Sequence, residues 1–87
     1  MTTTTGIIRK VYLTLTGVIV KDVYADLEYI YTADNIKGTR RFEELGTDNV
    51  FIYFEATPHE FEQFQQSLKS LLKKNMYAKI QSLKIEE

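Results

Sequence analysis

Apolar residues along the chain follow two spacings, one typical of a helix and one typical of strands. In one segment they recur every three or four residues, as on a helix that buries one side. The members of this stripe are Phe61, Phe64, Leu68, Leu71 and Leu72. The segment therefore predicts a long amphipathic helix from Pro58 to about Lys74.

The start and the end of this helix are also marked. Thr57 and Glu60 have the spacing of a capping box, in which a hydroxyl and a carboxylate bind the free amides of the first turn. Pro58 suits the first helical position because that position needs no amide donor. Asn75 follows the last lysines and is predicted to end the helix in the left-handed conformation.

Segments on either side of the helix alternate as strands do. Residues 49–56 are apolar on both faces, which is typical of an interior strand. One face carries Val50, Ile52 and Phe54, and the other carries Phe51 and Tyr53. Residues 76–87 predict a final strand, and a slip of one residue in its apolar pattern indicates a β-bulge or a fraying end. A turn at residues 46–49 follows a short strand over residues 39–45.

The amino-terminal third is compatible with two element orders. Residues 7 to about 20 alternate as a strand with a bulge or a bend at Gly17, but residues 22–33 fit both periods. As a strand in a hairpin, this segment turns Tyr29 and Tyr31 inward. As a helix, it places Val23, Leu27, Ile30 and Tyr31 on one stripe. The hairpin is favoured because three tyrosines and several β-branched residues suit a short helix poorly.

The predicted fold is α+β, an antiparallel sheet packed on one long helix in the order ββββαβ. The helical alternative for residues 22–33 gives the ferredoxin-like order βαββαβ. The chain has 87 residues, too few for two separate cores, so residues 6–87 are predicted to form a single domain. Residues 1–5 are predicted to be a disordered polar tail.

Composition limits the environment and the partners. Hydrophobic residues make up 44% and charged residues 26%, proportions that allow a buried core. The net charge of -1 gives no overall field that would attract nucleic acid or an anionic membrane. Apolar runs are too short for a membrane span, and the amino terminus lacks the core of a signal peptide. A cytoplasmic protein without a membrane partner is expected.

Candidate catalytic chemistry is sparse. The chain has no cysteine, which excludes disulfides, thiolate zinc sites and cysteine nucleophiles. His59 is the one histidine, and it lies in the first turn of the predicted helix, where solvent is its expected neighbour. No nucleotide-binding or calcium-binding motif is present. The protein is therefore predicted not to be an enzyme, with no catalytic residue, no metal site and no cofactor.

Aromatic residues indicate an interaction surface. Phe51 and Tyr53 lie on the face of the interior strand that points away from the long helix, and Phe42 is expected to join them from the preceding strand. With one helix, that face has no cover within the chain, so an exposed aromatic patch is predicted. The leading prediction is a small protein–protein interaction module, acting as a homodimer, an inhibitor or an adaptor.

Two other functions remain open. Lys37, Arg40 and Arg41 surround Gly38 and are predicted to contact an anion or a partner. Together with tyrosines that stack on bases, they would make a binder of single-stranded nucleic acid, although nearby acids weaken a phosphate site. The third function, a ferredoxin-like regulator that binds a small molecule or an anion, requires residues 22–33 to be helical.

Overall fold

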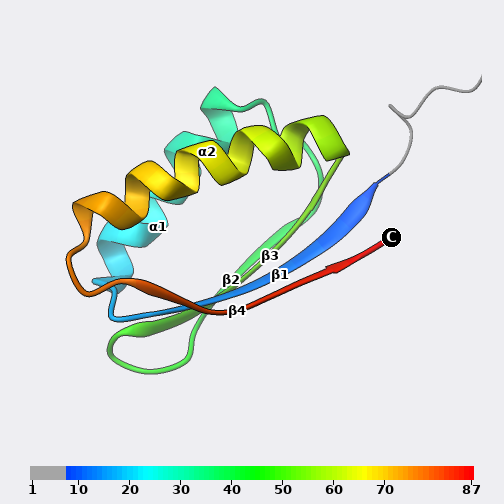
Figure 1. Ribbon diagram of the computed structural model, residues 1–87. Helices are drawn as coiled ribbons and strands as arrows, with labels where there is room; N and C mark the ends of the chain where they lie inside the picture. Colours follow the sequence, from blue (N-terminus) through cyan, green and yellow to red (C-terminus); the bar gives the residue numbers. More distant parts are fainter. Residues whose placement is uncertain (1–7) are drawn as a thin grey trace, which may run out of the picture.

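The computed structural model describes residues 8–87 and shows a four-stranded antiparallel sheet with two helices. Its elements are β1 (Arg9–Thr16), α1 (Val20–Ala33), β2 (Arg40–Glu44), β3 (Asn49–Ala56), α2 (Pro58–Lys74) and β4 (Lys79–Glu86). The strand order is β2-β3-β1-β4, and both helices cover the same side of the sheet (Figure 1). The predicted α+β class is confirmed, while the predicted tail at residues 1–5 lies outside the described residues.

The order of the elements is the ferredoxin-like alternative, and the predicted hairpin is wrong. Val20–Ala33 forms α1, whose buried residues are Val23, Leu27, Ile30 and Tyr31, the stripe that the helical alternative requires. Tyr29, which the hairpin would turn inward, is 74% exposed. In the sheet β3 occupies the place beside β1 that the hairpin would have given to this segment. The segment instead covers the sheet as a helix.

The carboxyl end of α1 is a Schellman motif. Asn35 has a φ of 58°, the Ile36 amide donates to the Tyr31 carbonyl at 2.9 Å, and the Asn35 amide donates to the Thr32 carbonyl at 3.2 Å. The amino end has no equivalent signal, because the side chain of Ile19 makes no capping hydrogen bond. The chain therefore marks the end of α1 more clearly than its start.

Helix α2 has the predicted bounds. Both hydrogen bonds of the capping box are present. The Glu60 amide donates to the Thr57 hydroxyl at 3.2 Å, and the Thr57 amide donates to the Glu60 carboxylate at 2.9 Å. The prediction of a left-handed Asn75 is wrong, because this residue has a φ of -115°. Its side-chain amide instead donates to the carbonyl oxygen of Leu71 at 2.8 Å, which satisfies an acceptor of the last turn.

One hydrophobic core lies between the helices and the sheet. Alternate residues of the two central strands are fully buried in it: Val11, Leu13 and Leu15 from β1, and Val50, Ile52, Phe54 and Ala56 from β3. Three rings join the layers, with Phe54 and Phe64 at 4.4 Å and Tyr31 and Phe54 at 5.9 Å between centroids. The intervening residues of β1 and β3 point to the other face, which neither helix covers (Figure 1).

Two irregularities shape the β1–β4 region. The pairing of β1 with β4 shifts between Thr14 and Leu15, in agreement with the bulge, the first of the two predicted alternatives. Gly17 ends β1 with a φ of 74°, a conformation that glycine adopts without strain. A Cβ at this position would lie 2.0 Å from the Tyr77 carbonyl oxygen, so the backbone approach also requires glycine.

Candidate functional site

Three aromatic side chains meet on the open face of the sheet. Tyr12 comes from β1, and Phe51 and Tyr53 come from β3; they are called the aromatic cluster below. The Tyr12 ring lies 5.1 Å from that of Tyr53 and 6.4 Å from that of Phe51, between centroids. All three side chains are half-buried, and they form a continuous patch on the two central strands.

The alternation of the strands builds this cluster. Side chains of consecutive strand residues point to opposite faces, so burial of Val11 and Leu13 turns Tyr12 outward. The antiparallel register then places Tyr12 directly beside Tyr53. Phe51 and Tyr53 lie on this face as the sequence predicts. Tyr12 was missing from the predicted interaction surface, although its alternation with the apolar Val11 and Leu13 indicates that it points to the other face.

Phe42 does not belong to the cluster, and the prediction that it joins this face is wrong. Phe42 pairs with Ile52, whose side chain points toward the helices, and it packs against the core. Its ring meets the ring of Tyr24 edge-on, with centroids 5.1 Å apart. The physical reason is the register that the loop between β2 and β3 imposes, which aligns Phe42 with a core residue rather than with Phe51.

Carboxylates contact the hydroxyl edges of the two tyrosines. The Tyr53 hydroxyl donates to Glu55, and this hydrogen bond is the main cause that raises the pKa of Tyr53 to about 12. The Tyr12 hydroxyl donates to Oε1 of Glu86 at 3.2 Å, and partial burial followed by this bond raises the pKa of Tyr12. Nζ of Lys84 lies 3.0 Å from Oε2 of Glu86. Hydrogen bonds from Lys84 and from Tyr12 lower the pKa of the Glu86 carboxyl.

Charges of both signs surround the cluster. Arg41 of β2 pairs with Tyr53 in register and forms an ion pair with Glu43 at 2.8 Å. Lys10 shares this face, since it pairs with Glu55 on one side and Glu86 on the other. The open face is therefore an aromatic centre with a mixed, nearly balanced rim of cations and carboxylates.

The predicted basic contact residues do not converge on one surface. The Arg40 guanidinium lies on the helix side of β2, 4.5 Å from the centroid of the Tyr31 ring. Burial raises the pKa of Tyr31, and the Arg40 charge partly offsets this effect. Arg41 points to the opposite face of the sheet, and Lys37 is exposed in the loop before β2. A contact with an anion or a partner at these residues stays a prediction.

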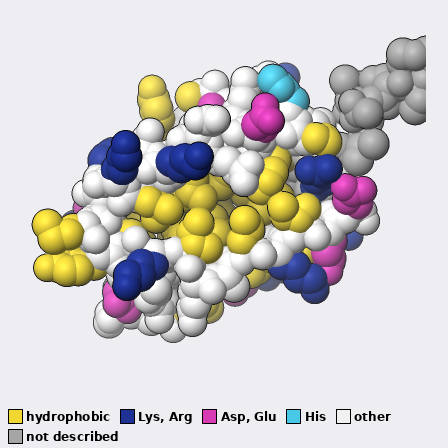
Figure 2. Space-filling view, in the orientation of Figure 1, with side chains coloured by type: hydrophobic (Ala, Val, Ile, Leu, Met, Phe, Trp, Pro, Cys, Tyr) yellow, Lys and Arg dark blue, Asp and Glu magenta, His cyan; other side chains and the backbone are white. Residues whose placement is uncertain are grey.

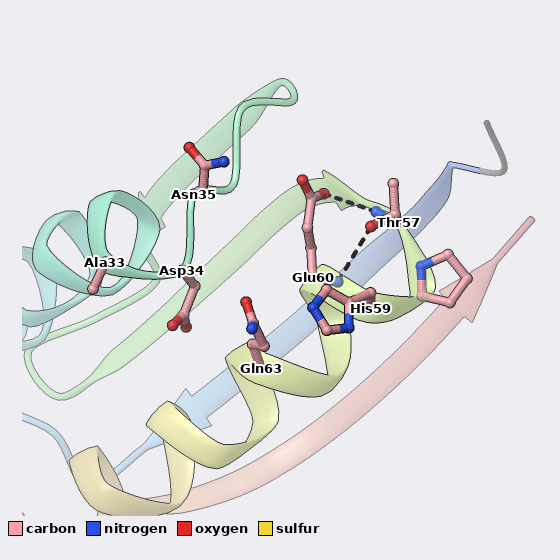
Figure 3. A pocket seen from close by; sticks show the side chains of 8 residues that line it. Ala33, Asp34, Asn35, Thr57, His59, Glu60 and Gln63 are labelled. Carbon is pink, nitrogen blue, oxygen red and sulfur yellow. Dashed lines mark hydrogen bonds between the residues drawn. The ribbon is translucent and has the colours of Figure 1, made fainter. Parts of the chain in front are cut away.

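An open hollow of about 550 Å³ lies between the end of α1 and the start of α2 (Figure 3). His59 lines it and is exposed. Two carboxylates line the hollow, and both already accept hydrogen bonds within the protein. Glu60 accepts one from the Thr57 amide, and Asp34 accepts one from the Ser67 hydroxyl, each at 2.9 Å. Within residues 8–87, no group of three His, Cys, Asp or Glu side chains is arranged to hold a metal ion.

Comparison with known proteins does not assign the chain. No protein-family model matches it, and no curated protein matches it either. In residues 8–87, none of the helices combines the length and the apolar character that crossing a membrane requires. Any functional inference therefore rests on the surfaces described above.

Proposed function

We propose that the protein is a small, non-enzymatic interaction module that docks a protein partner through the open face of its sheet. The observation that carries this proposal is the aromatic cluster of Tyr12, Phe51 and Tyr53 on a face that neither helix covers. Tyrosine and other aromatic residues are enriched at protein interfaces, where they bury large area with few rotatable bonds.

The surroundings of the cluster support a protein partner. An interface commonly has an apolar centre and a polar rim that stays accessible to water. Here the rim includes Arg41, Lys84 and Glu55, so cationic hydrogen-bond donors and an anionic acceptor surround the rings. A cytoplasmic location belongs to the same proposal.

Site-specific photo-crosslinking in the source cells tests the proposal. A photoreactive phenylalanine analogue in place of Phe51 should give discrete protein adducts, whereas the analogue in place of Tyr29, which is exposed on α1, should not. With the partner then purified, Phe51→Ala and Tyr53→Ala should each weaken binding by about tenfold or more, as for hot-spot aromatics. Adducts at position 29 alone, or undiminished affinity in both variants, contradict the proposal.

A single-stranded nucleic acid is a second candidate, and one observation favours it. The rings lie on the two central strands of a four-stranded sheet, where RNA-binding sheets place the aromatics that stack on bases. The carboxylates of Glu55 and Glu86 beside the tyrosine hydroxyls oppose phosphate binding.

Oligonucleotide binding at low salt, followed by fluorescence anisotropy, separates the two candidates. Nucleic-acid binding should fall steeply with added salt. It should also weaken in Arg41→Ala more than in Arg40→Ala, because only Arg41 shares the face of the aromatic cluster. Absence of binding to any single-stranded oligonucleotide removes this candidate. The helix that the third function requires is present, but no further observation favours that function.

A further inference from the structure

The two edge strands of the sheet differ in how readily a strand of another molecule could pair with them. β2 is a short strand, Arg40–Glu44, with charged side chains on both sides of Phe42. β4 is longer, Lys79–Glu86, and among the described strands it pairs with β1 alone. Short length and charge discourage the addition of a strand, whereas a long free edge invites it. The β4 edge is therefore the available one.

The helix-facing side of β4 is also incompletely covered. Ile80, Leu83 and Ile85 pair with core residues of β1 that are fully buried, yet they remain 43%, 41% and 40% exposed. Beside them an apolar groove runs between α2 and β4, and Figure 2 shows apolar side chains gathered there. The residues that line it include Phe61, Gln65, Lys69, Leu72, Ile80 and Leu83.

Charge changes sign along this groove. α2 and β4 run in opposite directions beside it (Figure 1), so the end of α2 lies near the start of β4. The basic end carries Lys69 and Lys73, and the acidic end carries Glu62. Within residues 8–87 none of these three side chains forms an ion pair, whereas Glu87, directly after β4, is paired with Arg9.

We propose that a second copy of the chain binds this groove, with the β4 strands of the two copies paired antiparallel about a two-fold axis. With the axis perpendicular to the sheet, β4 and α2 of the second copy run opposite to their counterparts, so the acidic end of each groove meets the basic end of the other. A register centred on Leu83 places this side chain beside Leu83 of the second copy. The partly exposed apolar side chains of both β4 strands then cover one another, and the free edge disappears.

Symmetry distinguishes a second copy from other strands that could add to this edge. Any other partner would need an acid and two lysines in matching positions beside its strand, whereas an antiparallel copy has that arrangement by construction. The pairing leaves the open face of the sheet uncovered, because β4 gains its neighbour in the plane of the sheet. The inference is therefore independent of partner binding at the aromatic cluster.

Sedimentation velocity of the full chain over a range of concentrations tests the proposal, with Leu83→Glu and its matched control Leu45→Glu. Leu45 is 55% exposed and lies next to β2, at the far edge. The unchanged chain and Leu45→Glu should form dimers with similar Kd. Leu83→Glu should raise the Kd by about tenfold or more, because it buries like charges together. A chain that stays monomeric up to about 1 mM, or equal Kd values for the two variants, overturns the proposal.

Charge exchange tests the arrangement without altering the apolar groove, and it remains decisive if Leu83→Glu does not fold. Glu62→Lys alone and the pair Lys69→Glu with Lys73→Glu should each raise the Kd several-fold. The three changes combined should restore it to within about threefold of the unchanged chain, because opposite charges again face each other across the axis. A combined variant that dimerises as weakly as its parents overturns the antiparallel arrangement. Phe51→Ala should leave dimerisation unchanged, and loss of the dimer in that variant overturns the assignment to β4.

Discussion

β3 presents similar side chains to its two faces, but the two faces differ in what packs on them. Val50, Ile52 and Phe54 are fully buried beneath the helices. Phe51 and Tyr53 alternate with them on the open face, stay half-buried and contact Tyr12 of the neighbouring strand. The composition of a strand therefore does not decide which side forms the core. The helices decide it, and the side they leave free is the side available to a partner.

The largest expected difference between the faces concerns two phenylalanines of β3. Phe54→Ala should lower the free energy of unfolding by about 3–5 kcal/mol, because it removes a fully buried ring that contacts Tyr31 and Phe64. Phe51→Ala should cost about 1 kcal/mol, since its ring is partly in water already. Denaturant unfolding followed by circular dichroism measures both. Equal losses would mean that the open face is as closely packed as the core.

The same contrast extends to the two sides of α1. Leu27→Ala should destabilise the protein by about 2–5 kcal/mol because Leu27 is buried, whereas Tyr29→Ala should change stability by about 0.5 kcal/mol or less. In a hairpin the two residues would share one face, and both changes would be costly. The pair of unfolding measurements thus separates the helix from the strand for this segment.

Two neighbouring arginines of β2 give a smaller difference. Arg40→Ala should cost about 1 kcal/mol, because its guanidinium lies over the buried Tyr31 ring. Arg41→Ala should cost about 0.5 kcal/mol or less, since its ion pair with Glu43 is exposed. Added salt should reduce the effect of Arg41→Ala further. A larger loss for Arg41 than for Arg40 would contradict the placement of these side chains on opposite faces.

The smallest expected effect is a change of titration on the open face. The pKa of Tyr53 is raised from its ordinary value of 10.0 to about 12, mainly by the hydrogen bond to Glu55, so the bond favours the neutral phenol. Its contribution to stability is fully present below pH 10 and is lost as the pH rises through about 12. Glu55→Gln should lower the pKa of Tyr53, measured by the chemical shift of its ring carbon. An unchanged pKa in this variant would assign the shift to another group.

Local signals in the sequence were sufficient for the carboxyl-terminal half of the fold. The capping box at Thr57 and Glu60 marked the start of α2, and the apolar alternation and its slip marked β3 and β4. Residues 22–33 lack such a signal, since their apolar residues fit both periods and Ile19 provides no cap. The helix there depends on β3 taking the place beside β1, and this contact between distant segments is not visible in a local pattern.

The candidate site divides in the same way. Alternation within one strand was enough to place Phe51 and Tyr53 on the open face. The place of Phe42 depends on the register between two strands, which a shift of one residue reverses. The separation of Arg40 from Arg41 needs no pairing, because consecutive residues of β2 point to opposite faces. Features that depend on one strand were therefore predictable, and features that depend on a pairing were not.

The short, charged β2 edge has a consequence for the size of any assembly. A two-fold pairing through β4 uses both long edges and leaves a β2 strand at each end of a continuous eight-stranded sheet. Arginines and glutamates at these ends oppose a further copy, so growth should stop at two chains. β2 would then limit the assembly to a dimer and prevent the growth of an open fibre.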